Sequence, residues 1–178
     1  WSRVRGCRGT GAGVEPLASE PQADRLAQQL LMARTNLRGY LMLMLRYAKA
    51  RGDSAADLAR FLGQQAAPTW GRLRNCTAID FARALAQLVE AGGDEVVTVR
   101  DEGGIARLEL RPPSTDDHLL SAFQIDRDEW HTLYYGQFER IAAWLGLRCL
   151  HERDGDLHRF YFARIARFTG FHERPLRV

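Results

Sequence analysis

The feature that most constrains the fold is an order of elements that occurs twice in the second half of the chain. Residues 77–111 read as a helix followed by two short strands, and residues 126–164 repeat this order. In each segment an apolar pattern of helical period gives way to β-branched or aromatic alternation, which is typical of a hairpin. We therefore predict an α+β fold, in which N-terminal helices pack on an antiparallel sheet built from two αββ units.

A long first helix is predicted before the repeat. Pro21 is a good first helical residue, and the helix should run to about Arg51. Its apolar residues recur at three- and four-residue steps, so we expect their face to be central to the core. These residues are Leu26, Leu30, Leu37, Tyr40, Leu41, Met44, Leu45 and Ala48.

A second, shorter helix should follow. Asp53 or Ser54 is placed to cap its first turn, because both side chains accept hydrogen bonds from free backbone N–H groups. Gly63 or Pro68 should loosen or end it, since both residues disfavour a helix interior.

Length and composition fit a single globular domain. Of the 178 residues, 46% are hydrophobic and 26% are charged, which is ordinary for a protein with a core. No apolar run approaches the ~18 to 20 residues that cross a bilayer, so no membrane span is expected. Residues 1–20 are rich in Arg and Gly without apolar periodicity, and we predict a flexible N-terminal segment followed by one domain over residues 21–178.

Charge and cysteine content argue against several classes of protein. The 25 basic residues are interleaved with 22 acidic ones, which favours a mixed solvated surface over a nucleic-acid partner. Cys7, Cys76 and Cys149 are an odd number at wide spacing, so neither a disulfide framework nor a paired-cysteine zinc site is predicted. A reducing cytoplasm is the expected location.

A set of Gly, Leu and aromatic residues marks the second αββ unit. These residues are Gly136-Gln137-Phe138, Ile141, Leu145-Gly146, Glu152, Gly155-Asp156 and Phe160-Tyr161-Phe162. In this order they resemble the closing part of the 4-vinyl-reductase domain family, which shares its fold with the TRAPP transport-particle subunits. Cysteines often flank the hairpin turn in that family, whereas Arg153 and Arg159 stand there in this chain. The resemblance implies a sensing or accessory module with a cavity between helices and sheet, and it names no ligand or cofactor.

An aromatic set is rich enough to line such a cavity, since small-ligand sites combine apolar walls with a few polar tips. Tyr134 and Tyr135 are consecutive, so on a helix they point about 100° apart and cannot both serve one core stripe. One of them, with His131 a turn earlier, should present a hydroxyl and an imidazole to a cavity or a partner. Ordinary core packing is the alternative. The predicted ligand-binding residues are Tyr40, Trp70, His131, Tyr134, Tyr135 and Phe138.

Cys76 is the candidate reactive thiol. It precedes a predicted helix start and lies near Arg72 and Arg74, and both features favour the thiolate. Cys149 could also act as a nucleophile if His151 or His131 lowered the pKa of its thiol, but burial as a small apolar side chain on a strand is the favoured interpretation.

Two histidines flank the predicted Asp-Gly turn of the second hairpin. His151 and His158 should face each other across it, with Cys149 on the same strand face. These three side chains could assemble as metal ligands, but the plainer interpretation is polar cross-strand residues on a solvent face. We predict no metal site.

The leading functional hypothesis is a binding module without catalytic activity of its own, which holds a small apolar or aromatic ligand between helices and sheet. A homodimer formed through a helix face is expected. One alternative is a small cytoplasmic hydrolase similar, in length and order of parts, to the thiazoline-carboxylate hydrolases. The other is a subunit of a larger complex. No residue is assigned a catalytic role.

Overall fold

A computed structural model describes residues 20–113 and 116–165 of the chain. The chain divides into two compact units, residues 1–33 and residues 34–178, which are described separately. The described part of the first unit is the beginning of helix α1 (Glu20–Ala50), and all other elements belong to the second unit. The segment predicted to be flexible therefore lies outside the described residues, apart from Glu20.

Both predicted αββ units are present, in the predicted places. The first consists of α3 (Ala78–Gly92), β1 (Glu95–Asp101) and β2 (Ile105–Arg111). The second consists of α5 (Arg127–Trp144), β3 (Leu147–Asp154) and β4 (Leu157–Arg164). The remaining elements are α2 (Ala55–Ala66), the 3-10 helix η1 (Ala67–Leu73) and α4 (Asp116–Phe123).

The helices of the second unit begin where local capping signals place them. Thr77 and Asp80 form a capping box at the start of α3, and Ser54 and Asp57 form one at the start of α2. Each box satisfies two backbone N–H groups that a helix end leaves without partners. Asp126 caps α5 by accepting hydrogen bonds from two backbone N–H groups.

Of the two residues predicted to loosen or end α2, Gly63 does not do so, whereas the α-helix does end just before Pro68. The helix continues through Gly63 to Ala66 and then tightens into η1, whose first turn accommodates Pro68. A Cβ atom at position 63 would lie 2.6 Å from the backbone oxygen of Gln137 and 2.8 Å from Cβ of Arg140. The glycine is therefore required because α2 and α5 pack closely at this point.

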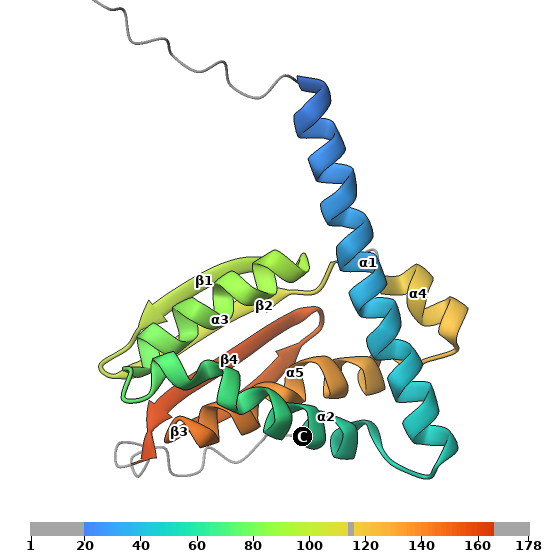
Figure 1. Cartoon of the computed structure of the whole chain (residues 1–178). Helices are drawn as coiled ribbons and strands as arrows, with labels where there is room; N and C mark the ends of the chain where they lie inside the picture. Colours follow the sequence, from blue (N-terminus) through green and yellow to red (C-terminus); the bar gives the residue numbers. More distant parts are fainter. Residues whose placement is uncertain (1–19, 114–115, 166–178) are drawn as a thin grey trace, which may run out of the picture. The chain divides into compact units, whose positions relative to one another are not determined.

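The four strands form one antiparallel sheet in the order β1-β2-β4-β3, so the second strands of the two hairpins pair in the middle (Figure 1). The buried side chains of β2 and β4 that share one face are Ala106, Leu108, Leu110, His158, Phe160 and Phe162. Helices α3 and α5 cover this face, as shown by the edge-on contact of Phe81 with Phe162 at 4.9 Å between ring centroids. The predicted α+β class is confirmed.

Helix α1 was predicted in the right place, but only part of its predicted apolar face is buried in the second unit, namely Leu45 and Ala48. Its buried residues there are Arg38, Met42, Leu45 and Ala48. Leu37, Tyr40 and Met44, which were expected in the core, are 58%, 67% and 41% exposed. Met42 and Leu45 instead pack in an apolar cluster with residues of α2, α4 and α5. None of the helices in the described part of the chain has the length and apolarity that crossing a membrane requires.

Candidate functional site

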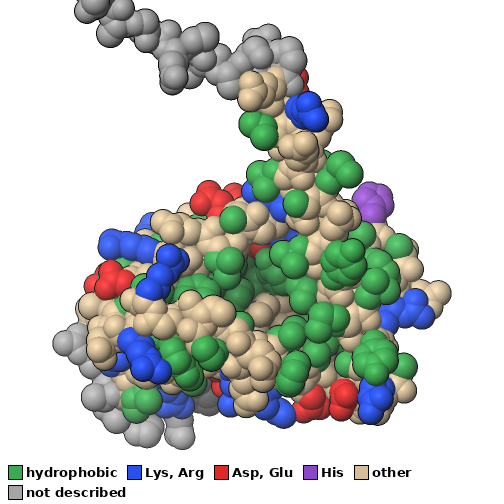
Figure 2. Space-filling model, viewed as in Figure 1, with side chains coloured by type: hydrophobic (Ala, Val, Ile, Leu, Met, Phe, Trp, Pro, Cys, Tyr) green, Lys and Arg blue, Asp and Glu red, His purple; other side chains and the backbone are tan. Residues whose placement is uncertain are grey.

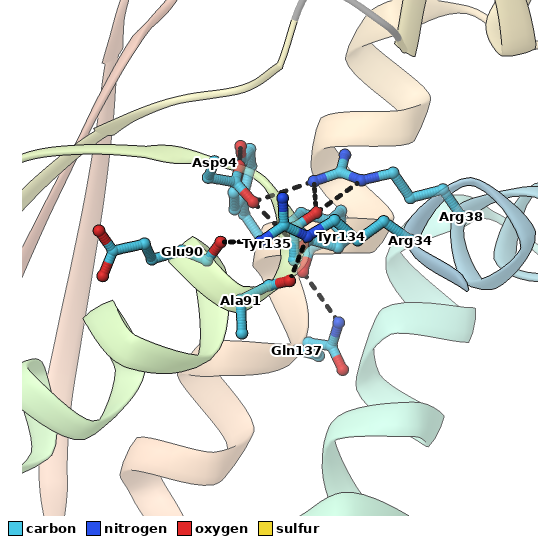
Figure 3. A network of polar contacts seen from close by, with 9 residues as sticks. Arg34, Arg38, Glu90, Ala91, Asp94, Tyr134, Tyr135 and Gln137 are labelled. Carbon is cyan, nitrogen blue, oxygen red and sulfur yellow. Dashed lines mark hydrogen bonds and ion pairs between the residues drawn. The ribbon is translucent and has the colours of Figure 1, made fainter. Parts of the chain in front are cut away.

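A buried carboxylate, that of Asp94, joins three elements at the junction between α3 and β1. Nη2 of Arg38, on α1, lies 3.0 Å from its Oδ2 atom. The hydroxyl groups of Tyr134 and Tyr135, on α5, donate hydrogen bonds to Oδ2 at 3.1 Å and to Oδ1 at 2.6 Å (Figure 3). Two consecutive tyrosines therefore reach the two oxygens of one carboxylate.

The C-terminus of α3 is held by the same helix α1. Arg38 donates through Nη2 to the carbonyl oxygen of Gly92 at 3.1 Å, and Arg34 donates through Nε to that of Ala91 at 2.7 Å (Figure 3). The last carbonyl groups of a helix lack intrahelical partners and form the negative end of its dipole, so guanidinium groups suit them. This part of the network fixes α1 to α3.

Burial sets the ionisation of the network. It raises the pKa of Asp94, while the hydrogen bond from Tyr135 and the charge of Arg38 act in the opposite direction. Burial also raises the pKa of Tyr135, and the neighbouring Asp94 adds to this effect. Tyr135 therefore keeps its proton at neutral pH and serves as a hydrogen-bond donor rather than as a base.

Tyr135 also packs against a cluster of three histidines. Its ring centroid lies 4.3 Å from that of His158, which lies 4.6 Å from that of His131. The predicted contact of His151 with His158 is confirmed, with 2.9 Å between Nε2 and Nδ1. The expected solvent exposure holds for His151 but not for His158, which shares the covered face of the sheet with Phe160 and is fully buried.

Two nitrogen atoms of this cluster have no hydrogen-bond partner among the described residues, namely Nδ1 of His131 and Nε2 of His158. Burial lowers the pKa of His131 to about 4, and the nearby Arg153 and Arg127 act in the same direction. Burial also lowers the pKa of His158 to about 3. Both rings are therefore neutral at pH 7, and unpaired buried nitrogen atoms of this kind are rare enough to require an explanation.

The described residues do not support a bound metal ion as the missing partner of these two nitrogen atoms. Within residues 20–113 and 116–165, no three His, Cys, Asp or Glu side chains are arranged to hold one.

His131 also borders a surface pocket of about 200 Å³. The residues that line the pocket are Glu95, Arg111, Pro112, Pro113, Asp117, Leu120, Arg127, His131 and Asp156. They come from α4 and α5 on one side, and from the start of β1, the end of β2 and the β3–β4 turn on the other. The pocket therefore lies between helices and sheet.

The lining of this pocket carries both signs of charge. Arg127 lies 2.6 Å from Oδ1 of Asp117 and 3.4 Å from Oδ1 of Asp156. Arg111 lies 3.3 Å from Oε2 of Glu95. All five side chains are at least 44% exposed, and ion pairs at such positions contribute about 1 kcal/mol or less. A charged ligand can therefore replace one partner of a pair at small cost.

The structure brings four of the six predicted ligand-binding residues together on α5. Ring centroids lie 5.6 Å apart for His131 and Tyr135, and 6.0 Å apart for Tyr135 and Phe138. Tyr134 stacks on Trp130 at 5.2 Å. Of these four, His131 is the one that lines the 200 Å³ pocket, while Tyr135 and Phe138 belong to the apolar core.

The other two predicted residues lie elsewhere. Tyr40 is 67% exposed on α1, because the helix buries the face that contains Met42 instead. Trp70, in η1, packs edge-on against Phe81 at 5.5 Å between ring centroids. Neither of them lines the pocket that His131 borders.

Cys76, the candidate reactive thiol, lines a different pocket of about 400 Å³ together with Asp101 and Arg164. Burial raises the pKa of its thiol, although the charge of Arg164 acts in the opposite direction. The expected lowering by the helix dipole is therefore outweighed. Burial also raises the pKa of Cys149, to about 12, as suits a thiol in an apolar setting.

Sequence reasoning missed Arg38 and Asp94. Arg38 lies one turn before Met42 and two turns before Leu45, so it shares a helix face with these apolar residues. This spacing could have indicated that Arg38 is buried. Asp94 follows Gly92 and Gly93, a pair typical of a helix end, and nothing in that local pattern indicates a buried carboxylate.

Comparison of the chain with models of protein families, with curated proteins and with solved structures finds no match. The resemblance to 4-vinyl-reductase domains therefore stays a prediction, and a functional proposal has to rest on the residues of the site.

Proposed function

We propose that this protein is a small-molecule-binding module of the sensing or accessory type, with its ligand in the 200 Å³ pocket between α4, α5 and the sheet. The observation that carries the proposal is His131, which lines the pocket, is 5% exposed and has a ring nitrogen without a partner among the described residues. A neutral imidazole offers one donor and one acceptor, and a bound ligand is a natural partner for it.

The charges of the pocket favour a ligand that carries both signs. Arg111 and Arg127 suit a carboxylate, because a guanidinium group binds it through two parallel hydrogen bonds. Asp117 and Asp156 suit an ammonium group. Leu120 and the two prolines supply the apolar part of the wall. Pockets for drug-sized ligands measure about 300–1,000 Å³, so this one fits a smaller molecule, such as a free amino acid.

Contacts lead from the pocket into the polar network. The ring of His131 contacts that of His158, which packs on Tyr135. The Tyr135 hydroxyl donates a hydrogen bond to Asp94. Asp94 in turn holds Arg38 of α1. This continuity favours a sensing or accessory role over a simple storage site, because a change at His131 reaches α1 through side chains in direct contact.

Isothermal titration calorimetry with the 20 common amino acids tests the proposal, followed by a matched set of probes. L-valine carries both charges, isovalerate lacks the ammonium group and isobutylamine lacks the carboxylate. Loss of one charged hydrogen-bonded contact costs about 1.5–3 kcal/mol, so each analogue should bind at least tenfold more weakly than the amino acid. Absence of binding by all 20 amino acids, or equal binding of the three probes, would overturn the proposal.

Substitutions in the pocket test separately its contacts with the carboxylate and with the ammonium group of the ligand. Arg111→Gln should remove the preference for valine over isobutylamine, and Asp117→Asn should remove the preference over isovalerate. Glu102→Gln is the matched control, because Glu102 lies outside the pocket and pairs with Arg107 at 3.6 Å on the surface. Its affinities should equal those of the native protein.

A further inference from the structure

Strand β3 lies at one edge of the sheet, where β4 is its single neighbour among the described strands (Figure 1). Arg148 and residues 150–154 are exposed. An exposed edge is a template for pairing with another strand, and natural edge strands are often protected by a bulge, by Pro or by Lys. β1, at the opposite edge, has a bulge between Val96 and Thr98. β3 pairs with β4 over eight residues without a bulge and contains neither Pro nor Lys, so it is the edge that is open to a further strand.

A groove borders the first half of this strand. It has a volume of about 580 Å³ and is lined by residues 147–150 of β3, by Glu139 and Ala143 of α5, and by Ile165. An added strand lies about 4.8 Å from the edge strand, and every second side chain of it points toward the layer of helices. The groove between β3 and α5 offers space for such side chains.

The charged side chains of β3 are arranged symmetrically about Leu150. His151 stacks on Phe160 of the covered face, with 4.3 Å between ring centroids, so Arg148, Leu150 and Glu152 point to the opposite face of the sheet. The basic and the acidic residue each lie two positions from the leucine. Charges of both signs are interspersed over the visible face of the molecule (Figure 2), but on β3 their order makes the strand complementary to a reversed copy of itself.

We propose that β3 pairs with β3 of a second copy of this chain, in antiparallel orientation and centred on Leu150. In this register Leu150 lies opposite Leu150 of the second copy, and Arg148 lies opposite Glu152 of the second copy on both sides of the symmetry axis. Apolar pairs and opposite charges that face each other directly across two strands stabilise the pairing. Moving the centre by one residue sets Leu150 opposite Arg148 or Glu152 of the second copy and loses both kinds of contact. The sequence of β3 therefore favours this register and this partner.

The proposed dimer is held by its backbone. In strand addition, main-chain hydrogen bonds supply the affinity and the facing side chains supply the specificity. Residues 147–153 of each copy pair with the same residues of the other copy in this register. An interface limited to one strand from each copy is small, and small interfaces are typical of transient complexes. The dimer should therefore be reversible and dissociate on dilution.

Solution mass by light scattering, with reversal of the two charges, tests the partner. At about 100 μM, above a Kd in the micromolar range, the native protein should approach twice the monomer mass of 20.2 kDa. Arg148→Glu and Glu152→Arg should each be monomeric, because like charges then face each other on both sides of the axis. An equimolar mixture of the two variants should dimerise, because opposite charges face each other again. Circular dichroism checks that both variants are folded.

Arg100→Glu is the matched control for this experiment. Arg100 is exposed on β1, at the other edge of the sheet, so the same change of charge there should leave the dimer intact. A monomeric native protein, a dimer that survives either single reversal, or a mixture that stays monomeric would overturn the proposal. Dissociation of the dimer by Arg100→Glu would also overturn it.

Disulfide trapping tests the register. Directly facing Cα atoms of antiparallel strands lie about 4.5–5.5 Å apart, which a disulfide can bridge. Under mild oxidation, Leu150→Cys should therefore give a cross-linked dimer beyond the level of the native protein. Asp154→Cys is the control, because it is exposed on the same strand face but its two copies would lie about 27 Å apart. Absence of cross-linking by Leu150→Cys, or equal cross-linking by the two variants, would refute the register centred on Leu150.

Discussion

Arg38 on α1 and Asp94, which directly precedes β1, form an ion pair in which both side chains are buried, with 5% and 0% of their surfaces exposed and 3.0 Å between Nη2 and Oδ2. Removing two charges from water is costly, and their attraction compensates only when other hydrogen bonds complete the site. Here the hydroxyls of Tyr134 and Tyr135 and the carbonyl oxygen of Gly92 do so. The pair is therefore sensitive to loss of either partner.

Replacing Arg38 by Met should reduce the free energy of unfolding by about 3–5 kcal/mol, because Asp94 is left buried without its counter-charge. Urea unfolding at pH 7 measures this change. The control is Lys49→Met on the same helix, since Lys49 pairs with Glu129 at 2.6 Å near the surface and should contribute about 1 kcal/mol or less. Similar losses for the two variants would show that the Arg38 pair has no special role.

Replacing Gly63 by Ala should reduce the free energy of unfolding by about 1–3 kcal/mol. The new Cβ would lie 2.6 Å from a backbone oxygen of α5, so the two helices must move apart. This outcome opposes the usual gain from a Gly→Ala change inside a helix. Thermal unfolding compares it with Gly71→Ala, where the nearest atom, of Trp144, lies 3.9 Å away. A stabilised Gly63→Ala protein would contradict the close packing.

Stability should fall between pH 6.5 and pH 4 because of the buried histidines. The pKa of His131 is lowered to about 4 in the folded protein, from an ordinary value of 6.5. As pH falls through 6.5, the unfolded chain takes up protons that the folded protein does not, so unfolding becomes more favourable. His131 alone should account for about 3 kcal/mol by pH 4. Asp94 contributes in the opposite direction, because its pKa is raised.

Urea unfolding of His131→Leu at pH 7, 5 and 4 isolates the contribution of that histidine. The variant should lose less stability than the native protein over this range. Identical pH dependence for the two proteins would show that His131 is not held neutral by burial.

Cys76 should react slowly with a disulfide reagent at pH 7.5. Burial raises the pKa of its thiol, so the reactive thiolate is a minor species. The rate with 5,5′-dithiobis(2-nitrobenzoic acid), compared between the native protein and Cys76→Ser, should lie below that of free glutathione. A rate above that of glutathione would restore Cys76 as a reactive thiol.

The sequence was sufficient for the two αββ units because their signals are local. Thr77 and Asp80 mark a helix start, and the Asp154-Gly155 turn closes a hairpin, wherever the rest of the chain lies. The buried face of α1 depends instead on tertiary packing. The predicted face joined residues that the fold exposes, such as Tyr40, to residues that it buries, such as Leu45, and it left out the buried Arg38.

The site was only partly predictable for the same reason. His131, Tyr134 and Tyr135 could be selected from their spacing on one helix. Their partner Asp94 comes from another element, about 40 positions away in the sequence. The pocket combines residues of α4, α5 and three strand ends, and no single motif spans them.

The most direct test of the proposed ligand site is nuclear magnetic resonance of ¹⁵N-labelled protein, observing the imidazole nitrogen atoms of His131 as an amino acid is added. We predict that a saturating amino acid shifts the Nδ1 resonance of His131, because that unpaired atom gains a partner, while the indole resonance of Trp70 stays unchanged. A His131 resonance that stays unchanged when each of the 20 amino acids is added in large excess would contradict the proposed site.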